Sequence, residues 1–136
     1  SGIFLYTYCK RLIANTNRNR GNNYERQIVN ELKNLGFESV VTSRSESRNL
    51  DNKKVDIFDP EDNFPFYIQN KAYQNYPKLH ELIDSEDVCK KKPLMVFHKK
   101  VVKKGTRFYT EGEYVSMKKE EFYKLLMQAY GNSQNK

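Results

Sequence analysis

The chain has 136 residues, which is enough for one domain with a single core of moderate size. A hydrophobic content of 38% and a charged content of 30% are near the globular average and argue against general disorder. No stretch approaches the roughly 18 apolar residues of a membrane helix, and the apolar run at residues 3–8 lacks the flanks of a signal peptide. We therefore expect a cytoplasmic protein in which Cys9 and Cys89 are reduced thiols rather than zinc ligands or a disulfide.

The formal net charge of +7 favours a polyanionic partner, of which nucleic acid is the commonest. The basic residues gather in two clusters, and residues 90–110 contain no acid. A lysine run is often only a solvated face, and for residues 90–92 that alternative has equal weight. The two clusters are Lys10, Arg11, Arg18, Arg20 and Arg26, then Lys90, Lys91, Lys92, Lys99, Lys100, Lys103, Lys104 and Arg107.

The N-terminal part of the chain predicts an amphipathic helix behind two segments of unclear structure. We expect residues 1–13 to be a leader of unknown role, residues 14–130 a single domain, and residues 131–136 a flexible tail. Residues 15–23 are Asn-rich and basic, which is typical of a flexible arm. A helix capped by Asn22 or Asn23 should follow and end at Gly36. Its apolar stripe is Tyr24, Ile28, Leu32 and Leu35.

Strands and two further helices are expected after Gly36. We predict a strand over 37–43, a loop over 43–54, and strands over 54–58 and 64–71 joined by a turn. A helix beginning at Pro77 would turn Leu79, Leu82 and Ile83 inward, and 94–98 reads as a buried strand. Short strands (101–102, 107–110, 113–115) with turns at Gly105 and Gly112 precede a helix capped by Ser116. Its apolar face is Phe122, Leu125, Leu126 and Ala129. This order predicts an α/β three-layer sandwich around a mixed sheet.

Two adjacent strands carry the residues that suggest chemistry. Joined by a tight turn, they would bring Asp56 beside Gln69, and Gln69 and Lys71 share one face because side chains alternate along a strand. An acid between Val55 and Ile57 is rarely buried unless it is paired or binds a metal. A carboxylate and an amide carbonyl are oxygen ligands that suit Mg²⁺. Such an ion promotes phosphodiester hydrolysis, and the Lys71 ammonium would stabilise charge on the phosphate.

The spacing Asp56 … Gln69-Asn70-Lys71 resembles the PD-(D/E)XK nuclease signature, in which an acid is followed by acid-x-Lys on the next strand. The surrounding sequence resembles the archaeal-type Holliday junction resolvases from about residue 14 to 121, and looks most like phage-encoded members. The matching segments are residues 20–29 as the first helix, Leu35-Gly36-Phe37 as its end, Thr42-Ser43-Arg44-Ser45 as a Ser/Arg loop, Lys54-Val55-Asp56-Ile57, and residues 66–71.

This resemblance implies a restriction-endonuclease-like fold and a homodimer that cleaves four-way DNA junctions with Mg²⁺ or Mn²⁺. It adds Glu25 to Asp56, Gln69 and Lys71 as catalytic residues, with Glu25, Asp56 and Gln69 holding the metal. The implied DNA contacts are Arg18, Arg20, Ser43, Arg44 and Ser45. Most members carry Glu where this chain has Gln69, so the site loses one negative charge and should bind its metal less tightly.

Two alternatives to a resolvase stay open, and some polar residues have two interpretations. The chain could be a nuclease of the same fold that acts on duplex or flapped DNA, or a DNA-binding module whose catalytic site has decayed. Ser43, Arg44 and Ser45 could form an ordinary polar strand end. Tyr73 and Tyr76 are expected to pack in the core, with stacking on a base or sugar as the alternative. His98 is expected to be structural.

Overall fold

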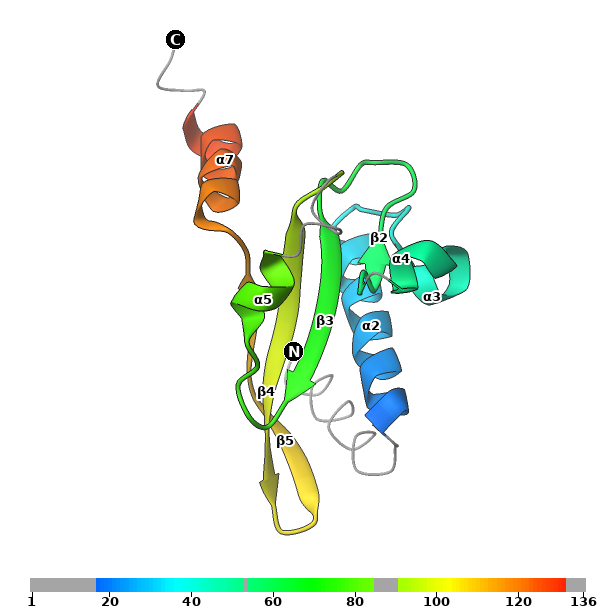
Figure 1. Ribbon diagram of the computed structural model, residues 1–136, viewed down its shortest axis with the longest axis vertical. Helices are drawn as coiled ribbons and strands as arrows, with labels where there is room; N and C mark the ends of the chain where they lie inside the picture. Colours follow the sequence, from blue (N-terminus) through cyan, green and yellow to red (C-terminus); the bar gives the residue numbers. More distant parts are fainter. Residues whose placement is uncertain (1–16, 53, 85–90, 132–136) are drawn as a thin grey trace.

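The structure, a computed structural model, describes residues 17–52, 54–84 and 91–131 (Figure 1). In this part of the chain, no helix is long and apolar enough to cross a membrane. The predicted leader 1–13 and most of the predicted tail lie outside the described residues. The elements in chain order are α2 (Asn17–Asn34), β1 (Val41–Thr42), α3 (Ser43–Glu46), α4 (Arg48–Asn52), β2 (Ile57–Phe58), β3 (Tyr67–Tyr73), α5 (Leu79–Ile83), β4 (Leu94–Lys104), β5 (Arg107–Ser116) and α7 (Lys119–Tyr130).

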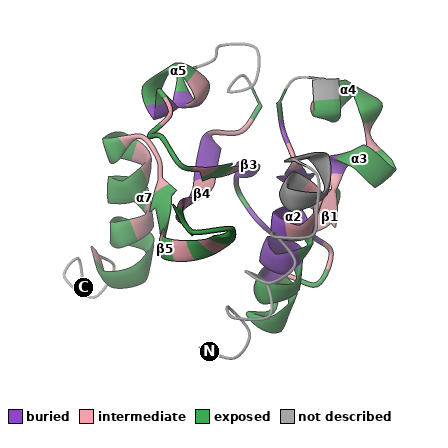
Figure 2. Ribbon diagram, turned by 90° about the horizontal axis from the view of Figure 1, so that it is seen from below, coloured by how far each residue is buried: buried purple, intermediate pink, exposed green. Residues whose placement is uncertain are grey.

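The strands form one five-stranded sheet in the order β1-β2-β3-β4-β5. β3 and β4 run parallel, and the other neighbours are antiparallel, so the sheet is mixed. The parallel pair needs a crossover connection, which contains α5. Figures 1 and 2 show α2 on one side of β3 and β4 and α5 on the other. The predicted three-layer α/β sandwich is confirmed.

The first hydrophobic core fills the space between α2 and the sheet. Tyr24, Ile28 and Leu32 are buried, as the helical spacing predicted, and they belong to one cluster with Ile57 and Ile68 of β2 and β3. Burying each such side chain contributes about 1.5–3 kcal/mol. This packing fixes the rotation of α2 about its own axis, and therefore the direction of every other side chain on that helix.

The end of α2 departs from its predicted apolar stripe. Leu35 is 75% exposed because the helix stops at Asn34 and the chain turns away at Gly36. Gly36 has a φ of 110°, a conformation that side chains with a Cβ rarely adopt. The backbone N–H groups of Gly36 and Phe37 close the helix on Lys33 and Leu32. The predicted glycine cap is confirmed.

The second core lies on the opposite face of the sheet. Leu79 and Ile83 of α5 are buried in a cluster with Tyr67, Leu94 and Val96. The neighbouring residues Ile68 and Met95 belong to the first core, so successive residues of β3 and β4 alternate between the two layers. The two-sided burial of these strands matches their continuous apolar sequence.

Several predicted boundaries were wrong. α2 starts at Asn17 rather than after Asn22 or Asn23, so the predicted flexible arm is partly helical. Residues 43–54 contain α3 and α4 instead of a loop, and helix α5 begins at Leu79 rather than Pro77. β4 and β5 are long strands with an irregularity between Lys100 and Val101, where we expected short strands and a turn. Local sequence signals are weak where long-range pairing supplies the hydrogen bonds.

The last helix differs from its prediction in both its start and its burial. Lys118 occupies the N-cap position of α7, while Ser116 is still the last residue of β5. α7 has no buried residue, and Figure 2 shows it without any buried segment, in contrast to α2. Phe122 and Leu126, two residues of the predicted inward face, are 47% and 39% exposed. Only Leu125 packs, partly buried, against the first core.

Candidate active site

Two backbone hydrogen bonds and one to its carboxylate hold Asp56 between β3 and the start of α3. Its N–H donates to the carbonyl of Ile68 at 2.8 Å, and its carbonyl accepts from the N–H of Ser43 at 2.9 Å. The N–H of Asn70 donates to Asp56 Oδ2 at 2.8 Å. Because Ile57 pairs with Ile68, Asp56 lies opposite Gln69, as the two-strand prediction required. The acid is therefore fixed at a defined position beside β3.

The short helices α3 and α4 support the segment that leads into Asp56. Ser43 starts α3 with a fully buried side chain, and its hydroxyl donates to the carbonyl of Val55. The N–H of Val55 donates in turn to the carbonyl of Leu50 in α4 at 3.0 Å. Between them, Lys54 has a φ of 68°, which redirects the chain from α4 toward β2. This left-handed conformation is costly for a residue with a Cβ, so the surrounding hydrogen bonds must enforce it.

Gln69 and Lys71 extend from the middle of β3 on the same face. Gln69 is 4% exposed, and its Oε1 is buried without a hydrogen-bond partner. An unpaired buried amide oxygen costs about 1–3 kcal/mol, so this atom needs a ligand. Lys71 is half-buried, which leaves its ammonium able to reach solvent. The strand therefore presents one vacant acceptor and one cation two residues apart.

Glu25 lies next to Tyr24 on α2, and the packing of Tyr24 determines where Glu25 points. Its carboxylate is largely buried and accepts a hydrogen bond from Arg44 Nε at 3.1 Å, an ion pair whose arginine is partly exposed. Burial raises the pKa of Glu25, and the neighbouring Arg44 opposes that rise. This contact joins α2 to α3 beside the Asp56 segment.

Asp56 is the most perturbed acid of this group. Its pKa is raised to about 7, mainly by burial and also by the negative charges of Glu25 and Asp51, while the Asn70 N–H and Lys71 oppose the rise. The protein's own cations therefore do not compensate the charge of this carboxylate. Asp51, in α4, was missed in the sequence because residues 43–54 were predicted to be a loop. Its only sequence signal is its position five residues before Asp56.

The donor set fits a hard divalent cation. The uncompensated Asp56 carboxylate and the vacant Gln69 Oε1 are oxygen ligands of the type that Mg²⁺ prefers. Among the described residues, no three His, Cys, Asp or Glu side chains gather closely enough to hold a metal ion by themselves. A metal here would therefore depend on Gln69 and on water as well as on carboxylates.

The proposed DNA contacts differ in how accessible they are. Ser43 is buried, and its hydroxyl is used within the protein, so this placement gives it a role in positioning Asp56 rather than in contacting phosphate. Ser45 is exposed, with its hydroxyl donating to the carbonyl of Thr42 at 3.0 Å. Arg18 and Arg20 belong to the first turns of α2, where the structure describes only the backbone.

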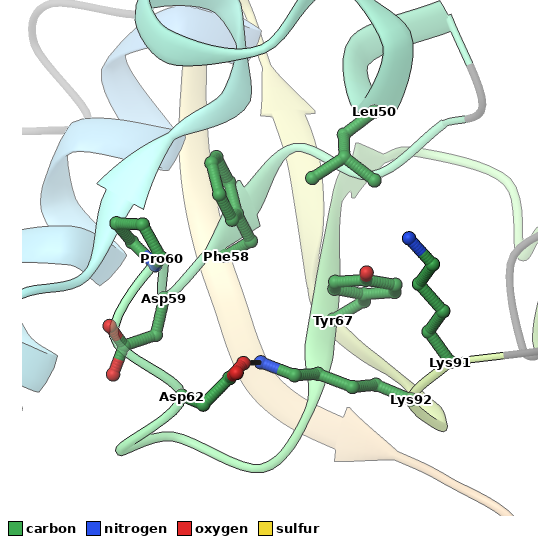
Figure 3. A pocket seen from close by; sticks show the side chains of 8 residues that line it. All are labelled: Leu50, Phe58, Asp59, Pro60, Asp62, Tyr67, Lys91 and Lys92. Carbon is green, nitrogen blue, oxygen red and sulfur yellow. Dashed lines mark ion pairs between the residues drawn. The ribbon is translucent and has the colours of Figure 1, made fainter.

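The basic stretch after residue 90 does not form one uniform surface. Lys99 is fully buried, with its ammonium 4.6 Å from the centre of the Tyr24 ring. Lys92 forms an ion pair with Asp62, at a hollow of about 360 Å³ beside the β2–β3 turn (Figure 3). None of the four predicted catalytic residues lines that hollow. Part of the positive charge is thus used within the fold.

Comparison with known proteins identifies one family. The family model of the archaeal Holliday junction resolvases (Hjc) matches residues 16–110, more than half of the chain. The match includes all four predicted catalytic residues and ends within β5. No curated protein and no solved structure matches the chain.

Proposed function

Since the chain belongs to the archaeal Holliday junction resolvase family, a family of DNA nucleases, we propose that it is a metal-dependent endonuclease that resolves four-way junctions by paired nicks. The observation that carries this proposal is the position of Asp56 beside Gln69 and Lys71 of β3. The Asp56 carboxylate, held by the Asn70 N–H, lies opposite Gln69, and Lys71 follows on the same face. A metal ligand pair beside a cation suits hydrolysis of a phosphodiester.

We assign the metal, Mg²⁺ or Mn²⁺, to Asp56 and Gln69 Oε1, with Glu25 acting through water. When bound, such an ion polarises the phosphoryl oxygen and lowers the pKa of a coordinated water. Lys71 stabilises the negative charge that develops on the phosphate. Arg44 keeps Glu25 oriented toward the site through their ion pair. Gln69 in place of an acid leaves the site with one negative charge fewer, which weakens metal binding.

DNA binding in this proposal depends on backbone phosphates rather than base sequence. Ser45 presents a hydroxyl at the surface, Arg44 is partly exposed, and Arg18 and Arg20 belong to the turn of α2 that precedes Glu25. Hydroxyl and guanidinium groups suit phosphate oxygens and fix the register of a duplex without reading it. Selectivity for a junction would then come from the geometry of the DNA.

A symmetric junction needs two nicks, and a two-fold dimer supplies two sites. The exposed face of α7 supports such an assembly. Phe122, Tyr123, Leu126, Met127 and Tyr130 are between 39% and 71% exposed on one short helix. A contiguous apolar surface of this kind usually marks an interaction site. A second copy of this chain is the occupant that the two-nick reaction requires.

The test compares cleavage of a synthetic four-way junction, a flap and the matched linear duplex, with and without Mg²⁺. We expect symmetric nicks in the junction arms that depend on the metal, and slower cleavage of the duplex. The Asp56→Asn variant controls for contaminating nuclease. Equal rates on all three DNAs would make the chain a general nuclease of this fold. Binding without nicks under any condition would show that the site has decayed.

A further inference from the structure

A cluster of aromatic rings surrounds His98 on the sheet face that carries Lys71. His98 is 2% exposed, and its two ring nitrogens are hydrogen-bonded to the hydroxyls of Tyr73 and Ser116, each at 2.8 Å. The Tyr73 ring stacks on the imidazole with centroids 5.7 Å apart. Tyr114 contacts the imidazole at the same separation. His98 is therefore fixed by two hydrogen bonds and by its ring contacts.

Two tyrosines of this cluster project into solvent. The Tyr76 ring forms T-shaped contacts with Tyr73 and His98, with centroid distances of 5.5 and 6.2 Å, and is nevertheless 70% exposed. Tyr114 is 54% exposed. The expectation that Tyr73 and Tyr76 pack in the core is wrong, because Tyr73 is half-buried outside both core clusters and Tyr76 lies at the surface. The fold thus exposes two rings that pack on the hydrogen-bonded His98, and exposed aromatic rings of this kind favour recognition of flat ligands.

This cluster lies next to the proposed active site. Lys71 pairs with His98 and Tyr73 pairs with Lys100 in the β3–β4 register. Tyr73 follows Lys71 by two residues, which is about 7 Å along a strand. The ammonium of Lys100 donates to the carbonyl of Gln74, in the loop that leads to Tyr76. A ligand on the exposed rings would therefore lie between the catalytic lysine and a second cation.

The neighbouring charges favour a nucleic-acid ligand. Lys71 and Lys100 suit phosphates on either side of a base, and the chain carries a net charge of +7. Aromatic side chains bind the face of any base, but the bases within a continuous duplex are covered by their neighbours. A branch point interrupts the continuous stack, so a protein that opens the branch can reach a base face there that a continuous duplex does not offer.

We propose that Tyr76 and Tyr114 form a platform for a base exposed at a DNA branch point, beside the phosphate that is cleaved. The Tyr76 ring stands at 89° to the His98 ring and the Tyr114 ring at 33°, so the two tyrosine rings are steeply inclined to each other. The more exposed Tyr76 therefore stacks on the base, and Tyr114 borders it. This proposal rests on the proposed function and specifies how the same site distinguishes branched DNA from duplex. Tyr73, His98 and Ser116 are positioning residues that hold the platform. Lys71 then acts on a phosphate whose distance from the branch is set by the platform.

The experiment measures binding and stacking without cleavage, in Ca²⁺ rather than Mg²⁺. Four-way junction and flap DNA carry 2-aminopurine at the branch point or, as a control, within one arm. We expect the wild type to quench the branch-point probe through stacking and to leave the arm probe unchanged. Tyr76→Ala should abolish the quenching and weaken binding of branched DNA roughly 5- to 150-fold, the range for loss of one stacked base. Tyr114→Ala should reduce both the quenching and the binding to a smaller extent. Duplex binding should stay unchanged.

Tyr109→Ala is the matched control, because Tyr109 is 38% exposed on β5 and pairs there with Val102 rather than with a residue of this cluster. Thermal melting shows whether each variant keeps its fold. Tyr76→Phe should retain binding, since a phenyl ring also stacks. Two outcomes would overturn the proposal. One is that Tyr76→Ala and Tyr114→Ala bind branched DNA as tightly as the wild type does; the other is that the wild type leaves the branch-point probe unquenched on both DNAs. The cleavage assay with Mg²⁺ judges the proposed function separately.

Discussion

The buried Lys99 gives a prediction whose size follows from the structure. Burial lowers its pKa from the ordinary 10.5 to about 7, with Glu113 opposing the fall. At about 1.4 kcal/mol for each pH unit, placing this group in the core costs about 4 kcal/mol at pH 7. The contact of its ammonium with the Tyr24 ring returns about 2 kcal/mol. We expect Lys99→Met, which replaces lysine by an uncharged, unbranched side chain one atom shorter, to stabilise the protein by about 2 kcal/mol at pH 7.

Urea denaturation followed by circular dichroism measures this change in the free energy of unfolding. Its dependence on pH distinguishes the effect of the Lys99 charge from effects of packing. Between pH 7 and 10.5 the unfolded chain holds the Lys99 proton and the folded chain releases it, so Lys99 becomes less unfavourable as pH rises. The advantage of the Met variant should therefore shrink toward pH 10. Lys103→Met is the control, because Lys103 also lies near an aromatic ring, Phe108, but is exposed.

Glu113 requires one further comparison, since Lys99→Met removes a cation from its surroundings. Burial raises the pKa of Glu113, the negative charge of Glu31 adds to the rise, and Lys99 opposes it. The double variant Lys99→Met/Glu113→Gln removes both charges and should be at least as stable as the single one. The burial argument would be refuted if Lys99→Met is less stable than the wild type at pH 7 and the difference in their free energies of unfolding stays constant up to pH 10.

Three further predictions concern the site and the assembly. Asp56→Asn and Lys71→Ala should abolish junction cleavage and largely retain junction binding in a gel-shift assay; retained cleavage in Asp56→Asn would place the metal elsewhere. Gln69→Glu should keep activity and lower the Mg²⁺ concentration for half-maximal rate, because it adds a negative charge at the metal. Isothermal titration calorimetry with Mn²⁺ should show tighter metal binding by this variant. Loss of activity would instead indicate that the site requires a neutral ligand at this position. Leu126→Glu should convert a dimer to a monomer in sedimentation velocity. Leu35→Glu makes the same substitution at a more exposed leucine outside α7 and should leave the dimer intact. A Leu126→Glu protein that is still a dimer would exclude α7 as the interface.

The sequence alone determined those features that depend on side-chain periodicity. The spacing of Tyr24, Ile28 and Leu32 identified the buried face of α2, and Gly36 its end, because a helix repeats every 3.6 residues. Alternation along β3 placed Gln69 and Lys71 on one face, and the short turn placed Asp56 opposite Gln69. These relations are local or span a single hairpin, so no knowledge of the other layers was needed.

Only the tertiary structure decided which groups outside these patterns reach the site and the surface. α3 and α4 form in a polar segment because Ser43 and Leu50 bond to Val55 and Asp56, just before β2, and this brings Asp51 near the acid. Lys99 is buried, Tyr76 is exposed and α7 lies without cover because their neighbours come from distant segments of the chain. Burial and pKa depend on these non-local neighbours, which composition and spacing do not specify.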